Sequence, residues 1–333
     1  MKRNIDNILR YIRLAVDEHR LESGKYARWC YQSAKGDRDL SRLEYGCADA
    51  ANILYTLGAF PQDADERASF VQVLQSFQGE DGLFEEPTHH PLHTTAHCVA
   101  ALELFDAKPL RPLTYHKEHF DTEEKLCAYL ASLDWKSGPW NAAHRGAGLY
   151  SAMVLTEKMP LTWQNTYFDW LSEHCDPETG LGLRGSHGEK PMLHHLAGWF
   201  HYLFNFTYAR RPIPYAKQAV DACISLYREE LCHLGHFGHS ISFAEIDWVY
   251  ILNRASSQCG HRREEAKETL RAFADVFFTY LETDLETAYA KRFDDMHGTF
   301  GALCAIAELQ AALPGEILST VPLRLVLDRR PFI

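Results

Sequence analysis

The sequence lacks the long apolar runs and the concentrated positive charge that several classes of protein need. No run approaches the roughly 20 apolar residues that span a bilayer. Charged residues interrupt the apolar positions of the basic N-terminus, so it has no continuous core of the kind found in signal peptides. The formal net charge is -11, whereas a nucleic-acid or anionic-membrane partner would require clustered Lys and Arg. We therefore expect a cytoplasmic protein with no nucleic-acid and no membrane partner.

Paired cysteines are also missing. The chain has nine cysteines, an odd number, and no CxxC motif. Reduced and mostly buried thiols are therefore expected in place of a disulfide framework. Apolar residues make up 46% of the chain and charged residues 24%, which is typical of a globular protein with a full core and argues against disorder.

The sequence contains a repeat of about 50 residues, which sets the order of the expected helices. His93, His144 and His194 begin three apolar helices and are 51 and 50 positions apart. Each cycle reads as an amphipathic outer helix, a glycine-containing turn and a more apolar inner helix. The expected inner helices are 44–57, 93–105, 144–155, 194–206, 243–255 and 299–313, and the expected outer helices are 5–20, 63–77, 121–133, 160–173, 216–231 and 262–281.

Six such hairpins cannot bury their inner helices singly, so they must pack on one another. Closed on themselves, they predict an all-α (α/α)6 barrel, or toroid, as a single domain over residues 1–333. An open solenoid is the alternative, but neither end resembles a polar capping repeat. Residues 314–333 are extended in character, and we expect this C-terminal tail to pack on the outside.

The best-preserved copy of the repeat is residues 74–105. It contains the turn GEDGLF (79–84) and the small-residue helix TTAHCVAAL (94–102), with weaker copies beginning at Gly138, Gly180 and Gly235. This unit resembles the repeat of the prenyltransferase and squalene-cyclase α/α toroids. The resemblance implies the toroid fold and a prenyl or terpenoid chemistry.

The sequence does not match the catalytic and zinc-binding motifs of these families. The nearest sequence to the acidic DxDD run of the cyclases is residues 63–66, at the start of an outer helix, and we find no match to the Asp, Cys and His zinc ligands of protein prenyltransferases. The (α/α)6 barrel is also the fold of glycoside hydrolases, polysaccharide lyases and sugar epimerases. The fold alone therefore does not select the reaction.

In such a barrel, the turns that lead into the inner helices surround one mouth of the ring, which is the expected site. Carboxylates and histidines there can transfer protons, since the ordinary pKa of His is about 6.5. Trp can stack on a sugar, and Arg can neutralise a uronate. The predicted catalytic residues are Glu44, Asp49, His144, His194, Asp247, Asp294, Asp295 and His297, and the predicted substrate-binding residues are His93, His97, Trp140, Arg145, His239 and Trp248.

These residues also have structural interpretations. A histidine at a helix start is often a cap, the adjacent Asp294 and Asp295 resemble N-capping groups, and Trp140 and Trp248 suit a core. His93 and His97 have the i, i+4 spacing that can bind zinc, but the Glu of HExxH is absent, so no cofactor is expected and zinc remains the alternative.

A polar mouth favours a hydroxyl-rich substrate over the carbocations of terpene cyclisation. We therefore expect a carbohydrate-active enzyme, either a glycoside hydrolase or a polysaccharide lyase or epimerase, that acts on a small molecule or an oligosaccharide. A terpenoid cyclase or prenyltransferase-like enzyme is the first alternative. A non-catalytic binding toroid is the second, and the sequence does not define an oligomeric state.

Overall fold

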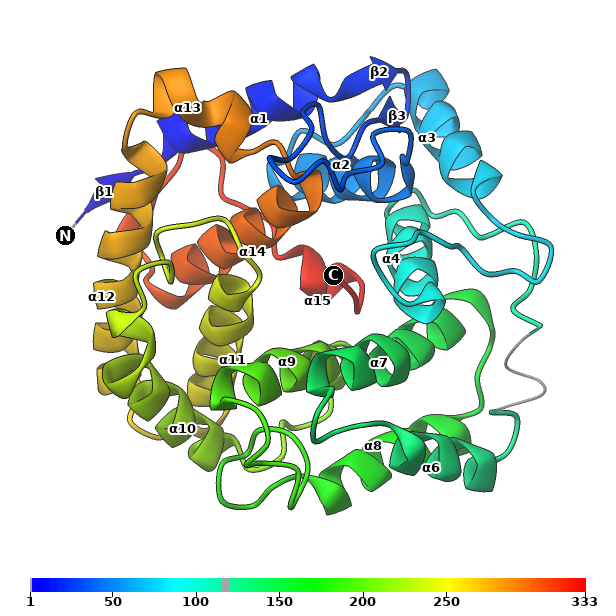
Figure 1. Ribbon diagram of the computed structural model, residues 1–333, viewed down its shortest axis with the longest axis vertical. Helices are drawn as coiled ribbons and strands as arrows, with labels where there is room; N and C mark the ends of the chain where they lie inside the picture. The colour runs from blue at the N-terminus through cyan, green and yellow to red at the C-terminus, as the bar shows by residue number, and fades with distance from the viewer. Residues whose placement is uncertain (1, 115–119) are drawn as a thin grey trace.

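The computed structural model describes residues 2–114 and 120–333, and this part of the chain is mostly helical (Figure 1). It contains 14 α-helices and two sheets of only two strands each. Strand β1 (Arg3–Asn4) pairs in parallel with β4 (Ile317–Leu318), and β2 (Arg20–Glu22) pairs antiparallel with β3 (Lys25–Tyr26). The prediction of an all-α protein is confirmed.

Six helices form the interior of the molecule. Each packs against two others of the set, so that the contacts run from α2 to α4, α7, α9, α11, α14 and back to α2. Figure 1 shows these six helices around a common centre. They are α2 (Glu44–Thr56), α4 (Pro91–Leu104), α7 (Pro139–Thr156), α9 (Met192–Tyr208), α11 (Ala244–Cys259) and α14 (Met296–Ala312).

Small residues allow the inner helices to approach one another closely. A Cβ atom at Gly148 of α7 would lie 2.9 Å from the carbonyl oxygen of Leu92 on α4, and one at Gly198 of α9 would lie 2.6 Å from that of Pro139 on α7. Both distances are too short for a real side chain. Glycine at these two positions is therefore required by the contact between neighbouring helices.

The remaining long helices lie outside this ring in Figure 1 and are amphipathic. In α1, for example, Ile8, Ile12 and Ala15 are fully buried while the opposite face is polar. The outer helices are α1 (Asp6–Glu18), α3 (Ala64–Ser76), α6 (Glu123–Ser132), α8 (Leu161–His174), α10 (Ala216–Glu229) and α12 (Arg263–Glu282), followed by the short α13 (Leu285–Arg292).

The twelve expected helices are all present. The largest difference is at α7, which begins at Pro139 rather than at residue 144. Proline fixes φ near the helical value and lacks an N–H, and it is therefore well suited to the first turn of a helix. Helix α13 was not expected. Among residues 2–114 and 120–333, no helix is both long enough and apolar enough to cross a membrane.

The end of the C-terminal tail differs from the prediction, because it lies inside the ring of helices and not on its outside. Helix α15 (Val326–Arg329) leads into the interior, and Figure 1 shows the C-terminus near the centre. Arg330, Phe332 and Ile333 are no more than 1% exposed, and the hydroxyl of Ser151 donates to the carbonyl oxygen of Pro331 at 2.6 Å. The small side chains of the inner helices leave space on the axis, which this apolar end fills.

Polar contacts attach the tail to the last turns of the inner helices. Arg254 of α11 pairs with Asp328 at 2.9 Å, and Arg329 pairs with Glu103 of α4 at 3.1 Å. The backbone N–H of Arg324 donates to the carbonyl oxygen of Thr56, the last residue of α2. Cations near the ends of helices are favourable because the carbonyl ends carry partial negative charge.

Candidate functional site

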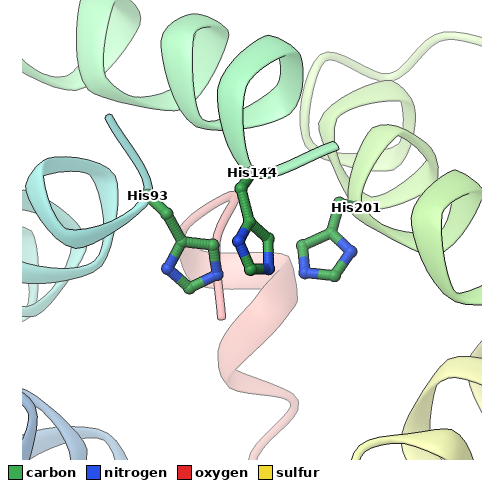
Figure 2. Close-up of side chains that lie close together, drawn as sticks. All are labelled: His93, His144 and His201. Carbon is green, nitrogen blue, oxygen red and sulfur yellow. The ribbon is translucent and has the colours of Figure 1, made fainter. Parts of the chain in front are cut away.

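Three histidines from three inner helices converge near the centre of the ring. His93 lies in the first turn of α4, His144 in the second turn of α7 and His201 further along α9. Figure 2 shows the three imidazoles next to one another. One nitrogen from each lies within 4.8 Å of the others, and the ring centroids of His93 and His144 are 4.2 Å apart. We call these residues the three-histidine cluster.

Hydrogen bonds fix the orientation of two of the rings. Nδ1 of His201 lies 2.9 Å from the carbonyl oxygen of Ala197 and therefore carries the proton. The hydroxyl of Tyr45 lies 2.6 Å from Nδ1 of His93. In the part of the chain that the structure describes, neither His93 nor His201 has a hydrogen-bond partner for Nε2, so these two nitrogens remain available as ligands.

The third ring has a different partner. The indole N–H of Trp140 donates to Nε2 of His144. Trp140 and His144 are also the partly exposed members of this region, while His93 and His201 are 2% and 4% exposed. The side of the cluster formed by Trp140 and His144 is therefore the one closest to solvent.

Burial keeps these imidazoles neutral. It lowers the pKa of His93 and of His144 well below the usual value, and neighbouring histidines lower both further. Burial lowers the pKa of His201 to about 4. A neutral imidazole has one nitrogen lone pair free, which is the form that binds a metal ion.

A second cluster lies beside the first and consists of Asp49 on α2, His97 on α4 and His297 on α14. We call it the Asp-His-His cluster. Oδ1 of Asp49 is 2.8 Å from Nε2 of His97 and 3.2 Å from Nδ1 of His297. Burial raises the pKa of the Asp49 carboxyl, but the two histidines outweigh this effect and hold its pKa well below the usual range. Burial lowers the pKa of His297 to about 3.

Tyr45 links the two clusters. Its hydroxyl contacts His93, its ring stacks on His97 with centroids 4.9 Å apart, and the edge of His297 meets it at 4.5 Å. His89 also stacks on Tyr45, at 4.5 Å, and lies 4.7 Å from His93. The two clusters thus form one continuous region of stacked rings.

The structure brings together part of the predicted site. The predicted residues found in or beside the two clusters are Asp49, His93, His97, Trp140, His144 and His297. His93 and His97 share a helix face, as their spacing predicts, but they belong to different clusters and do not form one three-residue group.

Three predicted carboxylates lie outside both clusters and make structural contacts. Asp294 accepts from the backbone N–H groups of Cys30 and Tyr31 and pairs with Arg38. Asp295 caps α14 by accepting from the N–H of His297, the capping role that its position allowed. Glu44 accepts from the N–H of Leu43 at the start of α2.

The other predicted residues also belong to neither cluster. Trp248 packs in the core against Tyr227 and donates to the carbonyl oxygen of Cys223. The guanidinium of Arg145 lies over the ring of Tyr129, 5.5 Å from its centroid. The remaining three are Asp247, which is buried on α11 with its pKa raised by burial and by Glu245, and the exposed His194 and His239.

A third group, His19, Cys30 and Asp294, has the composition of a metal site but not the free lone pairs. Both ring nitrogens of His19 already face carbonyl oxygens, those of Ala15 at 2.7 Å and of Asp294 at 2.8 Å. His19 is therefore a structural residue that ties α1 to the start of α14.

Sequence reasoning missed His201 and Tyr45. The repeat spacing selected His194 on α9, whereas His201 lies seven residues later, two helical turns along the same face. Its position could have been found by following that face deeper into the helix. Tyr45 lies one residue after the predicted Glu44, and nothing in the spacing distinguished it from a core aromatic.

The chain matches no family model, no curated protein and no solved structure. The similarity of its repeat to prenyltransferase and cyclase toroids therefore remains a prediction.

Proposed function

We propose that this protein is a metalloenzyme in which His93, His144 and His201 hold a divalent metal ion of the zinc type. The observation that carries the proposal is the convergence of three imidazole nitrogens, from the buried His93 and His201 and the partly exposed His144, within 4.8 Å of one another. Three histidine ligands with a fourth position left for water form a common type of catalytic zinc site.

Core packing alone does not explain why the three imidazoles converge. Among the described residues, Nε2 of His93 and Nε2 of His201 have no hydrogen-bond partner, and Nε2 of His144 accepts only from Trp140. A cation bound between the three rings would give all three nitrogens a partner. The hydrogen bonds between Nδ1 of His93 and Tyr45 and between Nδ1 of His201 and Ala197 are of the outer kind that commonly orients metal-binding imidazoles.

Trp140 has a distinct place in this proposal. Its indole N–H occupies the Nε2 lone pair of His144, so a metal ion at that nitrogen replaces this hydrogen bond. The indole then lies next to the metal on the more exposed side of the cluster. There it is positioned to contact a substrate that enters from solvent.

The proposed reaction class is attack by a metal-bound water on a small substrate, as in hydrolysis or hydration. A bound zinc ion lowers the pKa of its water to about 7, which supplies hydroxide at neutral pH. A saccharide substrate is compatible with this proposal, because Trp140 is a partly exposed aromatic residue beside His144 on which a sugar can stack. The carboxylate acid and base pair of a glycosidase has less support, since Asp294 and Asp295 are engaged in structural contacts.

We also infer that the fold is an (α/α)6 toroid forming one domain. The support is the cycle of contacts among six inner helices, each preceded along the chain by an amphipathic helix that packs outside. In a toroid, residues on the inner helices face a common axis. This accounts for the meeting of side chains that are about 50 and 100 positions apart in the sequence.

Metal content tests the proposed function. Purified full-length protein is expected to retain a transition metal through dialysis, and His201→Ala is expected to lose about one equivalent, because two imidazoles bind far more weakly than three. His194→Ala is the matched control, since His194 is an exposed histidine on the same helix. Elemental analysis of the folded proteins measures the difference, and equal metal content in the two variants would refute the three-histidine site.

A further inference from the structure

The Asp-His-His cluster has the geometry of a second ligand set. Two ligand atoms held at about 2.1 Å from one ion and at right angles to each other are about 3 Å apart. The observed separations from Oδ1 of Asp49 are 2.8 Å to His97 and 3.2 Å to His297. The three residues come from α2, α4 and α14, and each is 2% exposed or less.

Hydrogen bonding leaves this cluster incompletely satisfied. Within the described residues, Oδ2 of Asp49 and Nδ1 of His97 are buried and have no partner. Arg330 of the tail is close enough to affect both groups electrostatically, yet its guanidinium nitrogens also lack partners, so it forms no ion pair with Asp49. A buried carboxylate oxygen without a hydrogen-bond donor or a bound cation has a desolvation cost that no contact offsets.

We propose that Asp49, His97 and His297 bind a second divalent transition-metal ion. Two histidines and one carboxylate on one side of an ion leave further positions open, and this donor set suits Fe²⁺, Mn²⁺ or Zn²⁺. The proposal of this second site depends only on the geometry of the Asp-His-His cluster. A two-metal centre formed together with the three-histidine cluster additionally rests on the proposed function.

The two sites are neighbours and share a positioning residue. The ring centroids of His93 and His297 are 6.3 Å apart, and His93 and His97 are one turn apart on α4. Tyr45 contacts the first cluster through its hydroxyl and the second through its ring. Divalent ions held at both sites would supply two Lewis acids in one region, which is the chemistry that two-metal hydrolases use.

Metal stoichiometry in matched variants tests the second site. The full-length protein is stripped with a chelator and titrated with Co²⁺, with bound metal counted and its visible absorption recorded. Wild type is expected to bind two equivalents. Asp49→Asn, which keeps the shape of the side chain, and His297→Ala are each expected to bind one, with loss of one component of the Co²⁺ spectrum.

The outcomes separate the two proposals. If His201→Ala loses an equivalent while Asp49→Asn and His297→Ala bind as much as wild type, the second site is refuted and the three-histidine site stands. If Asp49→Asn loses an equivalent and His201→Ala does not, the second site stands and the proposed function fails. Circular dichroism of each variant identifies loss of fold, and Asp49→Asn provides the decisive comparison if His297→Ala does not fold.

Discussion

Acidification from about pH 7 to about pH 4 is expected to unfold the metal-free protein. Burial lowers the pKa of His201 to about 4 and that of His297 to about 3, and it lowers the pKa of His93 and His144 well below the usual value. In the unfolded chain the same groups have a pKa of about 6.5. Between these values the unfolded state binds protons that the folded state does not.

The sign of the effect follows from this difference. Stability rises with pH wherever the unfolded state holds more protons, so the free energy of unfolding falls as the pH drops below about 6.5. Each buried histidine contributes up to about 1.4 kcal/mol per pH unit. Over the roughly 2.5 units from pH 6.5 to pH 4, four such groups contribute up to about 14 kcal/mol, which is comparable with the ordinary stability of about 5–15 kcal/mol. Asp49 has a depressed pKa, and its contribution is lost only at still lower pH.

Urea denaturation at a series of pH values measures this dependence. His201→Gln is expected to reduce the slope of unfolding free energy against pH by about 1.4 kcal/mol per unit in the region below pH 6.5. His194→Gln, at an exposed position on the same helix, should follow wild type. A stability that stays flat between about pH 6.5 and pH 4 would show that these histidines are not buried as neutral groups.

Replacing Phe332 with Ala is expected to cost about 3–5 kcal/mol of folding free energy. Phe332 is fully buried, and its ring lies 4.7 Å from that of His93 and 5.6 Å from that of Phe204. Removing it leaves a cavity at the centre of the ring beside the three-histidine cluster. Because the site loses a neighbour of His93, metal affinity should fall together with stability.

Val321→Ala is the control for the tail. Val321 belongs to the same C-terminal segment but is 53% exposed, so its truncation should change stability by less than about 0.5 kcal/mol. Chemical denaturation compares the two variants. An equally small effect for Phe332→Ala would mean that the end of the chain does not fill the centre of the molecule.

Much of the helical framework was predictable because it is encoded locally. The alternation of amphipathic and small-residue helices sets where each begins and ends, and α2 and α14 are close to the expected ranges. The position of the tail was not predictable in this way. Its residues 326–329 form a helix and its end enters the interior because the axis of the ring has space, which is a property of the assembled helices.

The candidate site, like the fold, was predictable only in part. His93 and His144 were found because the repeat places both at the start of an inner helix. His201 was missed because it lies two turns deeper in its helix than the repeat position, His194. Asp294 and Asp295 were selected by residue type, but an aspartate that caps a helix or binds backbone N–H groups has the same sequence signature as a catalytic one.

In the proposed site, three histidines bind one metal ion at the centre of the ring. Anomalous diffraction at the zinc absorption edge, from crystals of zinc-loaded wild type, locates such an ion. We expect a strong peak about 2.1 Å from a nitrogen of each of His93, His144 and His201. A map with peaks only at surface histidines such as His194 and His239, and none at the centre, would contradict it.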